Sequence, residues 1–102
     1  MKEYDLFVPL YYNDGTAIEP VKFQRLQAEL LAHFEGLSFF PQPNEGFWKM
    51  GGITYRDEIV IYRVLASRVR PARRFLAELK QRLKREFKQE EILIVEREVE
   101  TL

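Results

Sequence analysis

The stretch Gly46–Ala66, GFWKMGGITYRDEIVIYRVLA, decides the fold. A glycine-flanked aromatic segment leads into Tyr55–Ala66, the run of the chain richest in β-branched and aromatic residues. Two apolar sets alternate along this run: Ile59, Ile61 and Leu65 on one face, and Val60, Tyr62, Val64 and Ala66 on the other. A strand that is apolar on both faces is typical of a central position in a sheet. We therefore expect Gly46–Ala66 to form the central hairpin of a small α+β domain.

The remaining strands are shorter or interrupted. We expect them at residues 4–12, at residues 37–40 continued by 47–49, and at residues 92–100. Pro9 cannot donate to a strand ladder, so the first strand should be an edge there, or bulged. The segment Pro41-Gln42-Pro43-Asn44 should break the second strand.

Two amphipathic helices are predicted, at residues 20–35 and 71–88, each opened by a proline at a position where a missing N–H costs nothing. Their apolar stripes are Phe23, Leu26, Leu30 and Phe34 in the first, and Ala72, Phe75, Leu76, Leu79, Leu83 and Phe87 in the second. The order β-α-β-β-α-β is that of the ferredoxin-like split βαβ arrangement, an antiparallel four-stranded sheet with both helices on one face. We expect a single ferredoxin-like domain over residues 1–102.

The amino-acid composition and the absence of known motifs exclude several kinds of functional site. The 102 residues include no cysteine and one histidine, His33, so disulfides, thiolate metal sites and thiol nucleophiles are excluded, and no metal or cofactor is expected. No P-loop, GxGxxG or GxSxG motif occurs. Asp57 and Glu58 alternate to opposite faces of their strand and so form no acid/base dyad, and we assign no catalytic residue. No apolar run is long enough to span a membrane, and the N-terminus lacks signal-peptide features, so we expect the cytoplasm.

The net charge of zero hides an uneven distribution. Residues 68–89 carry nine Lys or Arg and two Glu, a net charge of +7, whereas residues 90–102 carry five Glu and one Arg, a net charge of −4. We expect an electrostatically two-sided molecule.

Self-association is the leading hypothesis for function. Two helices can cover only one face of a four-stranded sheet, and we assign Phe7, Tyr11, Tyr62 and Val64 to the uncovered face. An exposed apolar patch marks an interaction surface, and small sheets commonly bury a free face against a second copy. The chain is therefore predicted to be a non-catalytic module that forms homo-oligomers, a dimer first, through its open sheet face or an edge strand.

The runner-up hypothesis is a small-molecule site, or a cofactor-independent enzyme, around Trp48 and Tyr62. Its polar groups would be His33 and Arg63. The 41–52 loop has two interpretations, a binding lid that Trp48 closes or a bulged hairpin whose Trp48 covers one end of the core.

The third hypothesis is nucleic-acid binding through the second helix. Its candidate residues are Arg70, Arg73, Arg74, Lys80, Lys84 and Lys88. Two observations count against it. The basic arc would lie on the helix side and the aromatic residues on the opposite sheet face, and no RNP1-like segment is present.

Short motifs resemble those of small bacterial domain families of this size that have no established activity. They are Phe34-Glu35-Gly36-Leu37-Ser38, Gly46-Phe47-Trp48, Arg56-Asp57-Glu58 before a strand, and Phe87-Lys88-Gln89-Glu90-Glu91-Ile92-Leu93. Ser38 stands where threonine is commoner. The resemblance covers roughly residues 5–95 and implies a cytoplasmic bacterial protein with a ferredoxin-like fold. It implies no function.

Overall fold

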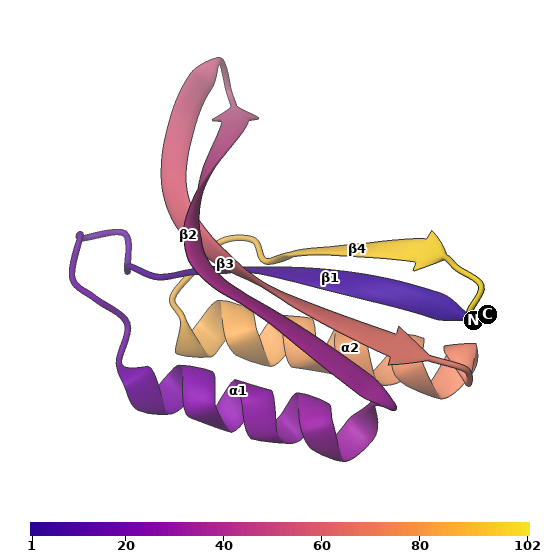
Figure 1. Cartoon of the computed structure of the whole chain (residues 1–102). Helices are drawn as coiled ribbons and strands as arrows, with labels where there is room; N and C mark the ends of the chain where they lie inside the picture. The colour runs from indigo at the N-terminus through magenta and orange to yellow at the C-terminus, as the bar shows by residue number, and fades with distance from the viewer.

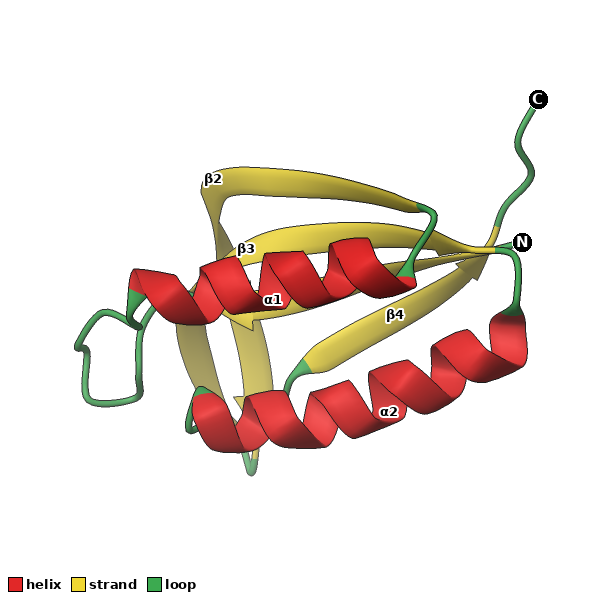
Figure 2. Cartoon of the chain, turned by 90° about the horizontal axis from the view of Figure 1, so that it is seen from below, coloured by secondary structure: helices red, strands yellow, loops and turns green.

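The chain folds into four strands and two helices in the order β-α-β-β-α-β, in a computed structural model that describes all 102 residues (Figure 1). The elements are β1 (Lys2–Pro9), α1 (Pro20–His33), β2 (Gly36–Met50), β3 (Ile53–Ala66), α2 (Val69–Glu86) and β4 (Leu93–Glu98). The strands form one antiparallel sheet in the order β2-β3-β1-β4. Both helices lie on the same side of the sheet (Figures 1 and 2). The predicted α+β class, with a four-stranded antiparallel sheet and two helices, is confirmed.

The hydrophobic core lies between the sheet and the helices and comprises 16 buried side chains. The helices contribute Leu26 and Leu30 from α1, and Ala72, Leu76, Leu79 and Leu83 from α2, as their sequence stripes predict. An ion pair between Arg82 and Glu29 links α2 to α1 across the helical layer. Neither helix has the length and apolar character needed to cross a membrane.

The prediction that Tyr62 and Val64 lie on the open face of the sheet is wrong. Tyr62 is 1% exposed and Val64 is 0% exposed, because both side chains belong to the core. In the β1–β3 register Tyr62 is opposite Leu6, and directly opposed residues share a face. The helices cover that face, so the open face carries the other alternating set. Across β1 and β3 this set is Glu3, Asp5, Phe7, Ile61, Arg63 and Leu65.

Pro9 ends an interior strand. β1 lies between β3 and β4, but its pairing with β4 stops at Phe7, which is opposite Leu93. Pro9 is therefore opposite a residue of β3 alone, Ile59, and has no β4 neighbour that would require an N–H donor. The expectation of a local edge at Pro9 agrees with this arrangement.

The second strand is not broken at its prolines. β2 runs through Pro41 and Pro43, with a register shift between Phe40 and Asn44 that leaves three residues of β2 against one of β3. This bulge is tolerated because β2 is an edge strand, where a missing N–H need cost no ladder bond. Beyond it the hairpin bends away from the helices (Figure 1). We call residues 44–59 the arm.

The arm turns at Gly51 and Gly52, whose φ angles are 57° and 78°. Two consecutive residues with positive φ are the requirement of a type I′ turn, which matches the twist of a two-residue hairpin loop. The glycine pair thus explains why residues 46–66 form a tight hairpin, as predicted.

Candidate functional site

The two faces of the arm differ. Cross-strand pairing places Trp48 with Tyr55 and Met50 with Ile53 on one face. Asp57 follows Tyr55 on that face by alternation, and further along β3 the face runs into the open face of the sheet. We call it the inner face of the arm. No helix covers it, and Met50, Ile53 and Tyr55 are 48%, 57% and 45% exposed.

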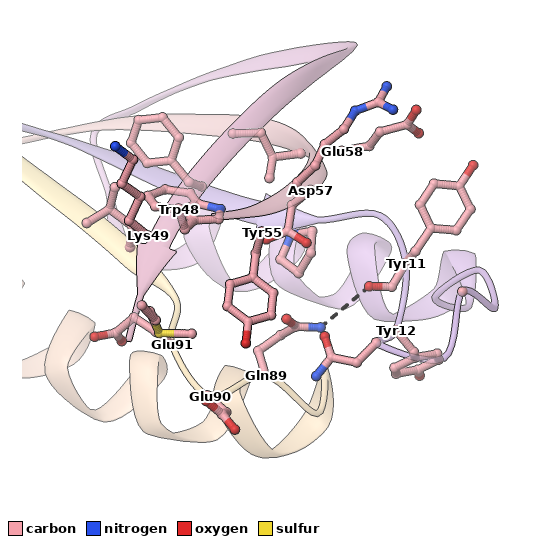
Figure 3. Close-up of a pocket in the computed structure, with 18 residues that line it drawn as sticks. Tyr11, Tyr12, Trp48, Lys49, Tyr55, Asp57, Glu58, Gln89, Glu90 and Glu91 are labelled. Carbon is pink, nitrogen blue, oxygen red and sulfur yellow. Dashed lines mark hydrogen bonds between the residues drawn. The ribbon is translucent and has the colours of Figure 1, made fainter. Parts of the chain in front are cut away.

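A groove of about 820 Å³ lies between the inner face of the arm, the end of β1 with the loop that follows it, and the segment after α2 (Figure 3). Its aromatic lining consists of Phe7, Tyr11, Tyr12, Trp48 and Tyr55. Tyr55 extends from the arm toward Gln89 (Figure 3). The Gln89 amide donates to the Tyr11 carbonyl at 3.5 Å, which connects two walls of the groove. The arrangement offers a concave, aromatic binding surface.

The groove is acidic. Asp57 borders it from the inner face of the arm and Glu58 from the other face of β3, and Glu90 and Glu91 border it from the segment after α2. Lys80 Nζ lies 3.0 Å from Glu91 Oε1, and this contact holds the pKa of the Glu91 carboxyl below its usual range. The other three carboxylates have no cation within 4.0 Å, so negative charge is left uncompensated. The cations of the lining are Lys49 and Arg56, and Arg56 already pairs with Glu45 on the arm.

Hydrogen bonds fix the wall that follows β1. Lys22 Nζ donates to the hydroxyl of Tyr12 and, at 2.7 Å, to the carbonyl of Glu86 at the end of α2. The Tyr12 hydroxyl in turn donates to Glu19. The hydrogen bond to Tyr12 is the main cause of the raised pKa of Lys22. These hydrogen bonds connect the loop after β1 to both helices. The arm has no such hydrogen bonds to a helix.

The four predicted pocket residues are not brought together. Trp48 lines the groove, whereas Tyr62 lies beneath Phe39, with ring centroids 4.6 Å apart, at a shallow hollow on the helix side. His33 is exposed in the last turn of α1 and stacks on Phe75 of α2 at 4.0 Å. The four residues do not form one pocket. Trp48 and Arg63 share the helix-free face, where Arg63 pairs with Asp5, whereas Tyr62 faces the helices and His33 belongs to α1.

Arg63 lies on the open face, in a cluster of four charges drawn from three strands. Its Nε is 2.8 Å from Asp5 Oδ1, and Arg97 Nη2 is 2.8 Å both from Asp5 Oδ2 and from Glu3 Oε1. Burial raises the pKa of Asp5, but the hydrogen bonds from Arg63 and Arg97 outweigh it and leave the pKa below its ordinary value. The cluster divides the open face, on which the sequence analysis had predicted an exposed apolar patch.

Two of the four predicted interface residues are accessible. Phe7 lies half-buried on the open face at the edge of the groove, and Tyr11 is 45% exposed in the loop after β1. Sequence analysis missed the exposed arm residues Phe47 and Ile53, since a hairpin that leaves its own sheet is a tertiary feature.

The basic residues of α2 are partly neutralised within the chain. Arg73 Nε is 3.1 Å from Glu96 Oε1 on β4, and Lys80 pairs with Glu91. Lys88, beyond the helix, lies over the Tyr12 ring at 5.3 Å. Arg70, Arg74 and Lys84 have no carboxylate within 4.0 Å, although the charge of Lys84 contributes to the lowered pKa of Glu91. The predicted basic arc is therefore not a continuous surface of free charge.

No family model, curated protein or solved structure matches this chain. The resemblance of its short motifs to small bacterial domains accordingly assigns it to no family. The structure contains no group of three or more acidic or histidine side chains that could hold a metal ion.

Proposed function

We propose that this protein is a cytoplasmic, self-associating interaction module without catalysis, and that a second copy packs against its arm. The supporting observation is the exposure of the arm: Phe47, Met50, Ile53 and Tyr55 are each 45% to 61% exposed. A two-stranded hairpin without further cover is marginally stable in water. A second copy would supply the missing cover, and a two-fold axis would let each arm serve the other.

The free edge of β2 supports the same proposal. β2 is at the edge of the sheet, and its segment Asn44–Met50 contains no proline. An unprotected edge presents a row of N–H and C=O groups that can pair with another strand. Pairing of two such edges would join two copies, and the exposed side chains of the arm would become buried at the junction.

We further propose that the fold is of the ferredoxin-like type. In support, β3 lies between β1 and β2, and β1 lies between β3 and β4, so each β-α-β unit spans an antiparallel strand. Such a sheet has one helix-free face. On this chain that face continues into the inner face of the arm, which makes the arm and the adjoining half of the sheet one surface for a partner.

Light scattering during size exclusion, over a dilution series, tests self-association. The chain has a mass of 12.2 kDa, and we expect about twice this mass for the wild type. Phe47→Glu with Ile53→Glu places charge on the arm and should give the monomer. Leu31→Glu is the matched control, because Leu31 is 59% exposed on α1, away from the arm, and should leave the mass unchanged. A wild type that is monomeric at every concentration contradicts the proposal.

The groove favours a second candidate function, small-molecule binding. Its volume of about 820 Å³ lies within the range of ligand pockets, roughly 300–1,000 Å³, and it combines aromatic walls with a few polar groups. Trp48, the single tryptophan, lines it, so a bound ligand should alter the intrinsic fluorescence. Unchanged emission with every class of ligand would contradict this second candidate.

A further inference from the structure

We propose that the groove beneath the arm binds a small organic cation, an ammonium or guanidinium group carried on an apolar body. This inference names the ligand class for the small-molecule function proposed above and rests on it. Three properties of the groove carry the argument: its charge, its free aromatic rings, and the division between its apolar and acidic walls.

The carboxylates that border the groove come from two of its walls. Asp57 lies on the inner face of the arm in β3, Glu58 borders the groove from the other face of that strand, and Glu90 belongs to the segment after α2. None of the three has a cation within 4.0 Å, whereas every ionised side chain of strands β1 and β4 is paired. Low-dielectric walls concentrate the field of such charges within a cleft. A cation entering the groove would therefore be attracted, and an anion would be repelled.

The aromatic rings provide the second attraction. The faces of tryptophan and tyrosine rings attract cations, tryptophan most strongly. One ring of the groove lining already has cations of the protein over it: Lys22 lies 5.0 Å and Lys88 5.3 Å from the centre of the Tyr12 ring. On the open face, Arg63 lies over the Phe40 ring at 5.1 Å. No cation of the protein occupies the faces of Trp48 or Tyr55, which are paired across the arm. Trp48 is half-buried, with its ring against Gly46, and Tyr55 is 45% exposed, so a cation supplied by a ligand would meet the Tyr55 ring and the uncovered part of Trp48.

The apolar and acidic residues lie on different parts of the groove. This arrangement favours a ligand that has an apolar body and a cationic group. Trp48, Tyr55 and Met50 form an apolar wall on the arm, and Phe7 and Leu93 lie across from it at the end of the sheet. The carboxylates stand at the margins of this apolar surface. An apolar body would fill the space between arm and sheet, and its cationic group would reach a carboxylate. A bare inorganic cation would leave the apolar walls without cover.

Three probes of one shape and different charge test the ligand class. They are phenethylamine, 2-phenylethanol and 3-phenylpropionate, which carry positive, zero and negative charge on a common phenylalkyl body. Each is titrated into the full-length protein while Trp48 emission is recorded, with calorimetry as the second readout. Protein concentration is held constant, so that any change of oligomeric state with dilution does not enter the comparison. We expect the amine to bind about tenfold more tightly than the alcohol, and the carboxylate most weakly.

Carboxylate variants test whether the preference for the amine arises from the acidic residues of the groove. Asp57→Asn combined with Glu90→Gln should lower the affinity for the amine about fivefold or more and leave that for the alcohol unchanged. Glu78→Gln is the matched control, because Glu78 is exposed on α2 and does not line the groove. The affinity for the amine should also fall as the salt concentration rises.

The outcomes distinguish small-molecule binding by the groove from a preference of the groove for cations. If the alcohol binds as tightly as the amine, the groove takes a ligand but the cation inference is overturned. The cation inference is overturned as well if the carboxylate variants leave amine binding intact. If no probe binds at concentrations up to about 10 mM, the small-molecule function and the ligand class fail together.

Discussion

Arg63 and Asp5 form a two-point ion pair across β3 and β1, on the face of the sheet that no helix covers. Arg63 Nε donates to Asp5 Oδ1 at 2.8 Å, and Nη2 donates to Oδ2 at 3.1 Å. Arg97 closes the other side, so Asp5 is only 4% exposed. Two arginine side chains, rather than an apolar layer, bury this carboxylate. The pair is therefore a structural element of the open face and not part of the groove.

Asp5→Ala should destabilise the protein, because it leaves both arginines without their shared partner. We expect a loss of about 2 kcal/mol in the free energy of unfolding, toward the lower end for charged hydrogen bonds, because the arginines are partly exposed. Urea unfolding measures the loss. Glu78→Ala, on the exposed side of α2, serves as the control and should change the free energy by less than about 0.5 kcal/mol. Equal effects of the two substitutions would contradict the assigned role of Asp5.

The contribution of the Asp5 ion pair to stability should depend on pH in the acid range. The folded-state pKa of Asp5 is below its ordinary value, so as the pH falls the unfolded chain takes up this proton first. The stabilisation from Asp5 is present above the unfolded-state pKa of about 3.9 and is lost as the pH falls through the folded-state pKa. The difference in stability between wild type and Asp5→Asn should therefore shrink below about pH 4. Other carboxylates also have lowered pKa values, so the difference between the two proteins is the quantity to follow. A difference that stays constant from pH 7 to pH 2 would exclude this linkage.

Titration to high pH should show that Tyr62, which the sequence analysis had assigned to the open face, is buried. Burial raises the pKa of Tyr62 to about 12, whereas in the unfolded chain the hydroxyl ionises near pH 10. The associated stability is complete below about pH 10 and is lost as the pH rises toward the folded-state pKa. Absorbance at about 295 nm, compared between wild type and Tyr62→Phe, should show that Tyr62 is still largely protonated at pH 11 in the folded protein. Ionisation near pH 10 would instead indicate an accessible hydroxyl.

Much of the fold follows from local sequence signals. Pro20 and the spacing of Leu26 and Leu30 locate α1, and the glycine pair locates the hairpin turn. Alternation along β3 identifies two sets of side chains, but it carries no information on which set the helices cover. That choice depends on the register between Leu6 and Tyr62, a contact between distant parts of the chain. The open face was misassigned for this reason.

The groove could be predicted only in part. Trp48 was singled out because an isolated tryptophan between glycines is distinctive. Its neighbours, Tyr11 and Gln89 to Glu91, come from segments far apart in the sequence and meet only because α2 ends beside the loop that follows β1. The prolines at positions 41 and 43 were interpreted as a break. They are compatible with a continuous strand because β2 has no neighbour on its outer side.

Leu79→Ala should cost far more stability than an alanine at an exposed leucine. Leu79 is 1% exposed in the core, and such truncations cost about 2–5 kcal/mol through lost burial and the remaining cavity. Leu31, 59% exposed on α1, is the matched control and should change the free energy of unfolding by less than about 0.5 kcal/mol. Chemical denaturation of both variants, at one protein concentration, gives the comparison. A cost below about 1 kcal/mol for Leu79→Ala would contradict the close packing of α2 on the sheet.

Gly51 offers a way to loosen the arm without touching the core. Its φ angle is 57°, and a Cβ built there meets no atom within 4 Å, so a substitution acts through the backbone alone. Gly51→Val should disfavour the turn by about 1–2 kcal/mol, since a β-branched residue is strained at positive φ. Gly51→Asn is the control, because Asn-Gly is a preferred type I′ sequence and should keep the turn intact.

Hydrogen exchange distinguishes a local effect from a global one. In Gly51→Val the amides of the arm should lose protection while those of β1 and α2 keep it, because the arm has no helix against it and can open as a unit. Trp48 emission should shift toward that of exposed indole in the same variant and stay constant in Gly51→Asn. Loss of protection spread evenly over the core would show that the arm folds together with the sheet. The arm would then be a fixed extension of β2 and β3, and its exposed residues would owe their order to the domain itself rather than to a second copy.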